Sequence, residues 1–120
     1  MMARVSIRHA RTGQVVAAAE VAERAADRRR GLLGRDGLEP GTGMLLRPCS
    51  SVHTFFMRFR IDVVFLDRDG RVLRVVQGMG PGRLAWGGWR AWQTLELASG
   101  AAAAAGVHRG DRLAWQTDGS

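Results

Sequence analysis

Apolar and polar residues alternate near the start of the chain. Val5 and Ile7 occupy every second position, Thr12 and Gly13 interrupt the run, and the alternation resumes over residues 14–18. Strict alternation is typical of a half-buried strand, and a glycine-containing break between two such runs is typical of a hairpin turn. The pattern therefore predicts an N-terminal β-hairpin.

The hydrophobic period changes after residue 20. Val21, Ala25, Leu32 and Leu33 fall on one helical face, and Gly34 follows the last of them. A spacing of three to four residues indicates an amphipathic helix, and a glycine just beyond it is a common helix end. We therefore expect a short helix between Val21 and Gly34.

The rest of the chain predicts short strands separated by turns. The run Val63–Leu66 within Ile61–Leu66 is apolar at every position, which indicates a strand covered on both faces. The Asp-Arg-Asp-Gly sequence that follows favours a tight hairpin turn. Further strands are expected at residues 43–47, 71–76 and 93–100, followed by a second short helix at residues 101–105 and by a turn and a closing strand over residues 106–116.

These elements define a fold class. We expect an α+β protein: a compact, mostly antiparallel β-sheet or partly open barrel of five to seven short strands with two small helices. At 120 residues, the chain is expected to form a single domain over residues 1–120.

Composition narrows the function classes. The net charge is +7, and all 18 basic residues are Arg. The arginines are dispersed along the chain, except for the cluster at Asp27–Arg30. A nucleic-acid interface is expected to show a contiguous basic patch with a recognisable motif. Arg-mediated nucleic-acid binding is therefore a disfavoured alternative. One cysteine excludes an internal disulfide, and no run is long enough to span a membrane. We expect a cytoplasmic protein with no membrane partner and no cofactor.

Cys49 and His53 form a Cys-x3-His pair. A structural metal site needs about four ligands, and neither a second cysteine nor a neighbouring histidine is present, so no metal site is expected. A hydrolase-type alternative uses Cys49 as nucleophile, His53 as base and Asp62 to orient the base. A lone cysteine is more often a small buried apolar residue.

Two carboxylates require explanation. Asp62 shares a face with Val64 and Leu66 in the strand expected to be covered on both sides, and a buried carboxylate needs partners. It either accepts hydrogen bonds from the turn at residues 56–60, with Arg58, Arg60 or His53 as other candidate partners, or it lines a polar pocket. Glu96 alternates with its apolar neighbours and faces either solvent or a pocket.

Aromatic residues gather in two segments. Phe55, Phe56, Met57 and Phe59 lie in a turn-like segment, where a core role is the commoner explanation. Three tryptophans lie in or beside the glycine-rich segment 77–88, which is predicted to be irregular: Trp86, Trp89 and Trp92. They either contact a ligand or partner, or pack as a lid over the core.

Four blocks match one known family in order: "RRRGLLGR", "GMLLRP", "SVHTFFMRFRIDVVFLDRDGRVLRVV" and "TLELASGAAAAAGVHRGDRL". The chain resembles domain of unknown function 192 (DUF192), a prokaryotic family, from about Val5 to Leu113. The resemblance implies a compact, β-rich α+β domain without an established activity. The family's signature positions fall on Gly43, Met44, Phe55, Met57, Asp62, Glu96, Gly100, Gly110 and Asp111.

The sequence thus favours a non-catalytic module that binds a small polar ligand or a partner. The expected ligand-binding residues are His53, Phe55, Met57, Arg58, Asp62 and Glu96. The alternatives are the Cys49/His53/Asp62 hydrolase and Arg-mediated nucleic-acid binding.

Overall fold

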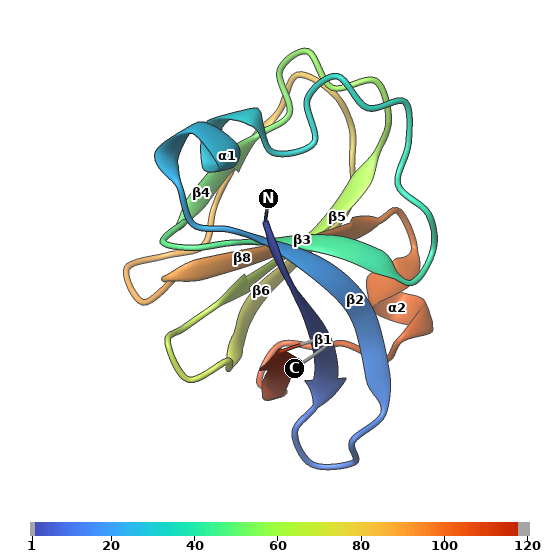
Figure 1. The fold of residues 1–120 in the computed structure, drawn as a ribbon, viewed down its shortest axis with the longest axis vertical. Coiled ribbons are helices and arrows are strands. Elements are labelled where there is room, and N and C mark those ends of the chain that lie inside the picture. The colour runs from blue at the N-terminus through green and yellow to red at the C-terminus, as the bar shows by residue number, and fades with distance from the viewer. Residues whose placement is uncertain (1, 118–120) are drawn as a thin grey trace.

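The structure is a computed structural model that describes residues 2–117, and these form nine strands and two short helices (Figure 1). The predicted α+β fold class is confirmed. The elements are β1 (Ala3–His9), β2 (Val15–Ala22), α1 (Ala25–Arg30), β3 (Thr42–Leu46), β4 (Ser51–His53), β5 (Ile61–Leu66), β6 (Val72–Met79), β7 (Leu84–Trp86), β8 (Gln93–Ala98), α2 (Ala101–Ala104) and β9 (Leu113–Thr117).

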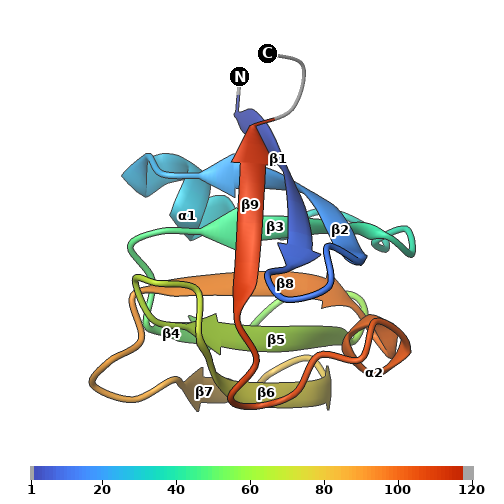
Figure 2. The same cartoon turned by 90° about the horizontal axis from the view of Figure 1, so that it is seen from below.

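Seven strands form one mixed sheet in the order β6-β5-β8-β3-β2-β1-β9. Every pair is antiparallel except β2 and β3, which are parallel. The sheet twists so strongly that β9 runs across the direction of β8, β5 and β6 (Figure 2). The edge strands β6 and β9 approach each other at the bridge between Arg71 and Arg112, so the sheet is a partly open barrel.

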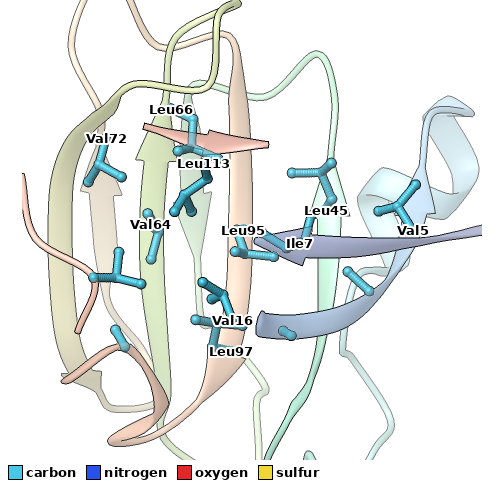
Figure 3. Close-up of a cluster of buried hydrophobic side chains, with 14 of the residues drawn as sticks. Val5, Ile7, Val16, Leu45, Val64, Leu66, Val72, Leu95, Leu97 and Leu113 are labelled. Carbon is cyan, nitrogen blue, oxygen red and sulfur yellow. The ribbon is translucent and has the colours of Figure 1, made fainter. Parts of the chain in front are cut away.

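The concave face of the sheet holds the larger apolar core (Figure 3). Side chains from all seven strands of the sheet meet there, among them Ile7, Val64, Leu66, Leu95 and Leu113. They come from alternate positions of their strands, which is the arrangement that the sequence pattern predicts. Helix α2 covers one side of this core through Ala102.

The other face of the sheet carries a second core. Ile61, Val63 and Phe65 of β5 pack there with Met44 and Leu46 of β3. Strands β4 and β7 form a separate two-stranded ribbon, and Val52 and Ala85 of this ribbon pack onto the same cluster. All six residues of β5 are buried, which confirms the prediction of a strand covered on both faces.

Two local predictions differ from the structure. The predicted helix from Val21 is shorter, because Val21 and Ala22 are buried in β2 and the helix spans only Ala25–Arg30. Packing against the sheet overrides the helical spacing at these two positions. The segment 77–88, predicted to be irregular, contains the end of β6 and the three-residue strand β7. Strand β7 is too short to show an alternating pattern in the sequence, and its pairing with β4 stabilises it.

Candidate functional site

The two carboxylates singled out from the sequence lie on opposite faces of the sheet. Asp62 pairs with Leu97 across β5 and β8, whereas Glu96 pairs with Val63. Side chains opposite each other in a ladder share a face, so Asp62 points to the concave core and Glu96 to the other face. They therefore cannot belong to one site.

Asp62 is satisfied by the backbone. Its Oδ1 accepts a hydrogen bond from the Gly78 N–H at 2.8 Å, and its Oδ2 accepts one from the Ala102 N–H at 3.0 Å. The side chain is 0% exposed. Of the two alternatives drawn from the sequence, the one with donors in the turn at residues 56–60 is wrong, because the donors belong to β6 and α2. Arg60 donates to the carbonyl oxygen of Gly78 instead.

Glu96 faces a cavity of about 700 Å³ between α1, β4 and the outer face of β8. Arg28 and Arg29 of α1 line it together with Gly31, which follows the helix, and Cys49, His53 and Trp92 line it from the opposite walls. The cavity thus collects a carboxylate, two guanidinium groups, a thiol and an imidazole around one space.

The surroundings of Glu96 explain why it lacks a partner. Its neighbours across the ladder are Val63 and Met44, which offer no hydrogen-bond donor. Its Oε1 is buried and makes no hydrogen bond in the described part of the chain. The position of a Cβ on Gly31 would lie 3.7 Å from that oxygen, so the absence of a side chain there keeps the carboxylate open to the cavity.

Burial raises the pKa of Glu96 from 4.5 to about 7. Between pH 4.5 and about 7, the Glu96 carboxyl group is therefore protonated in the folded protein and ionised in the unfolded chain. The free energy of unfolding is then expected to fall by up to about 3 kcal/mol as the pH rises from 4.5 to about 7, and to level off above that range.

Glu96→Gln removes the titrating group and is expected to abolish this decline. Urea denaturation of wild type and variant at about pH 5 and about pH 8 measures the effect. Glu39→Gln, at an exposed position, retains Glu96 and is expected to keep the wild-type decline. The same decline in Glu96→Gln as in the wild type would contradict the assignment.

Cys49 is held against β8 by its backbone. Its N–H donates to the Trp92 carbonyl oxygen at 2.8 Å, and its carbonyl oxygen accepts from the Thr94 hydroxyl at 3.1 Å. The thiol donates to the Ser51 carbonyl oxygen at 3.3 Å. Burial is the largest of the influences that raise the pKa of Cys49, so the reactive thiolate is disfavoured.

The other residues predicted from the sequence are dispersed around the outer face. His53 lines the cavity and stacks on Phe55 with ring centroids 5.2 Å apart. Met57 is buried in the outer core, and Arg58 forms an ion pair with Asp36 at the surface, 2.7 Å apart. The structure brings His53, Glu96 and Cys49 to one cavity and places Phe55, Met57, Arg58 and Asp62 outside it.

The hydrolase alternative required Cys49, His53 and Asp62 to meet. Cys49 and His53 line the cavity, but Asp62 points to the opposite face of the sheet, where both its oxygens accept backbone N–H groups. Within residues 2–117, no three His, Cys, Asp or Glu side chains cluster in a way that could hold a metal ion.

Sequence reasoning missed the contribution of α1 to the site. In the sequence, Arg28 and Arg29 form part of a basic cluster, which indicates nucleic-acid binding rather than a cavity. Gly31, which follows the helix, lies beside the Glu96 carboxylate. The available signal was the sequence Arg-Arg-Arg-Gly at a helix end.

Fold and site together define a class of protein: a compact, partly open barrel with a polar cavity on the outer face of its sheet. The chain belongs to the DUF192 family, whose model, described as an uncharacterized ACR, matches residues 6–115. This confirms the resemblance drawn from the sequence blocks. No curated protein is significantly similar to the chain.

Two solved structures share the fold. A protein of unknown function from Novosphingobium aromaticivorans is 22% identical, with a TM-score of 0.80 over 95% of this chain and 85% of that one. A protein from Sinorhizobium meliloti, described as a candidate transcription regulator, is 24% identical, with a TM-score of 0.79 over 96% of this chain and 94% of that one. At these identities the likeness shows the fold alone. No helix among residues 2–117 is long and apolar enough to cross a membrane.

Proposed function

We propose that this protein is a non-catalytic binding module for a small polar ligand, and that the ligand occupies the cavity beside α1. The observation that carries the proposal is the carboxylate of Glu96: the residue lines the cavity, and its Oε1 atom is buried and has no hydrogen-bond partner in the described residues. Gln93 Oε1 is the other such atom, but Gln93 does not line this cavity. A buried polar atom without a partner is costly unless a water or ligand satisfies it.

The charges around the cavity indicate the chemistry of the ligand. Glu96 at the floor requires a hydrogen-bond donor, such as an amine, amide or hydroxyl group. Arg28 and Arg29 at the helix side favour a negatively charged or strongly accepting group. A ligand with a donor at one end and an anionic group at the other matches both, and a simple cation would be repelled by the two guanidinium groups.

A thermal-shift screen with small amino, amido, hydroxy and zwitterionic compounds tests the proposal. A compound present at about 100 times its Kd stabilises the folded state by about 2.7 kcal/mol, which raises Tm by about 10 °C in a domain of this size. The response is expected to disappear in Glu96→Gln and to weaken in Ala25→Trp, because Ala25 lines the cavity and an indole there occupies part of its space.

Ala26→Trp is the matched control. Ala26 neighbours Ala25 on α1 and is also exposed, but it does not line the cavity. This variant is expected to respond to the compound as the wild type does. A compound that stabilises Ala25→Trp and Glu96→Gln as much as the wild type would contradict this location of the site, and no response from any compound would contradict the function.

A further inference from the structure

Exposed apolar side chains gather on and beside the outward face of the β4–β7 ribbon. His53 pairs with Leu84 across the ribbon, and Trp86 pairs with Ser51 on the same face. Phe55 stacks on His53, and Trp89 contacts Trp86 in an edge-to-face arrangement, with ring centroids 5.0 Å apart. We call the surface of Phe55, Phe56, Leu84, Trp86 and Trp89 the aromatic patch.

Three side chains of the aromatic patch are exposed to an unusual degree. Phe56 is 89% exposed, Trp89 is 93% exposed and Leu84 is 72% exposed. Contiguous exposed apolar surface of this kind marks an interaction site in a soluble protein. The glycine-rich chain around Trp89 does not cover it, so the alternative that these tryptophans pack as a lid over the core does not account for Trp89 or Trp86.

The backbone at Phe56 is held in an unfavourable conformation. Its φ is +66°, and it is the one non-glycine residue with a positive φ among residues 2–117. Such a conformation is rare for a bulky residue and persists where neighbouring contacts impose it. The Met57 N–H donates to the Thr54 carbonyl oxygen, and Met57 is buried, so the turn is fixed while Phe56 projects outward.

The surface around the aromatic patch is positively charged. The segments 51–60 and 83–90, which carry it, contain four Arg and no Asp or Glu. Arg83 precedes Leu84 and Arg90 follows Trp89; both are exposed, and neither guanidinium has a hydrogen bond or ion pair in the described structure. Asp36, which reaches this side, is paired with Arg58. The patch therefore complements a partner that is both apolar and anionic.

We propose that the aromatic patch docks the protein on the surface of an anionic lipid bilayer. Phe56, Leu84 and Trp89 would enter the interface, where aromatic and aliphatic side chains are favoured, and Arg83 and Arg90 would contact lipid phosphates. A single-stranded nucleic acid fits less well. Leu84 offers no stacking surface to a base, and His53 and Trp86 already have ring partners within the protein.

The sequence predicts no membrane partner because it contains no run long enough to span a membrane. Peripheral docking requires only side chains that reach the interface, so it is compatible with that absence. Phe56 and Trp89 do not line the cavity beside α1, so substituting them leaves the proposed ligand site intact.

Co-sedimentation with large unilamellar vesicles tests the proposal. The full chain is expected to bind vesicles made of equal parts of phosphatidylglycerol and phosphatidylcholine, to bind pure phosphatidylcholine more weakly, and to show a blue shift of tryptophan emission on binding. Phe56→Ser and Trp89→Ser are each expected to weaken binding about tenfold. Arg83→Gln and Arg90→Gln are each expected to weaken it about fivefold.

Val15→Ser and Arg11→Gln are the controls. Val15 is an exposed apolar residue and Arg11 an exposed arginine, and both belong to the β1–β2 hairpin rather than to the aromatic patch. Each is expected to change vesicle binding less than twofold, and thermal melting confirms that the variants are folded. No binding to the anionic vesicles at low salt would overturn the proposal, as would equal losses in the control variants. Trp89-dependent binding to oligothymidylate without vesicle binding would also overturn it, in favour of a nucleic-acid partner.

Discussion

Replacing Asp62 with asparagine is expected to lower the free energy of unfolding by about 3 to 5 kcal/mol. Each carboxylate oxygen accepts one backbone N–H, from Gly78 of β6 and from Ala102 of α2. Asparagine has a single acceptor oxygen, so its NH₂ group would face one of these N–H groups. Two donors would then oppose each other at a position that is 0% exposed, with no water to separate them.

Asp67→Asn is the matched control. Asp67 also accepts two backbone N–H groups, from Asp69 and Arg71, but both bonds go to the same oxygen, Oδ1, in an accessible hairpin turn. Asparagine keeps that oxygen, so the loss is expected to be below about 1 kcal/mol. Urea denaturation of both variants measures the difference. If both variants lose the same free energy of unfolding, neither burial nor the use of both oxygens determines how strongly Asp62 stabilises the fold.

The two backbone hydrogen bonds give Asp62 a structural role. It joins β5, the end of β6 and the start of α2 through two backbone groups, so it fixes the position of α2 over the concave core. The sequence also allowed Asp62 to line a polar pocket, and the unpartnered carboxylate that faces the cavity is Glu96. A ligand screen repeated on Asp62→Asn would be confounded by lost stability, whereas Glu96→Gln acts at the cavity itself.

Alternation along the strands predicted a large part of this arrangement. It placed Asp62 on the face of Val64 and Leu66, and Glu96 on the face opposite Leu95 and Leu97; the structure confirms both placements. Alternation fixes only the face of a side chain. The partners of Asp62 lie 16 and 40 residues along the chain, and such pairings depend on tertiary packing that a local pattern does not contain.

Local sequence patterns do not predict the cavity, for a related reason. It forms where α1 approaches β8 and β4, and each of these contributes a feature without a period: a six-residue helix, a three-residue strand and a single glycine. His53 and Glu96 were both selected from the sequence, but their meeting across separate sheets could not be deduced. Arg28 and Arg29 join them only because Leu32, just beyond the helix, is anchored in the outer core.

Substituting Gly70 with alanine is expected to cost about 4 kcal/mol or more of unfolding free energy. Gly70 ends the β5–β6 turn at φ +86°, and an added Cβ would lie 2.2 Å from the Leu113 carbonyl oxygen. The Leu113 N–H donates to the Gly70 carbonyl oxygen at 2.8 Å, so the two backbones are in direct contact where β9 begins. Relieving the clash requires separating them, which opens the barrel at its one point of closure in the described residues.

Gly13→Ala separates the steric cost from the conformational cost. Gly13 has a similar φ of +76°, but no atom lies within 4 Å of an added Cβ, so only the left-handed backbone is penalised, by about 1 to 2 kcal/mol. The difference between the two variants in urea denaturation gives the cost of the close approach. Hydrogen exchange at the Leu113 and Val72 amides is expected to accelerate in Gly70→Ala and not in Gly13→Ala, because those amides hydrogen-bond across the same junction. Equal destabilisation by the two substitutions would mean that contact between β9 and the β5–β6 turn does not hold the barrel closed.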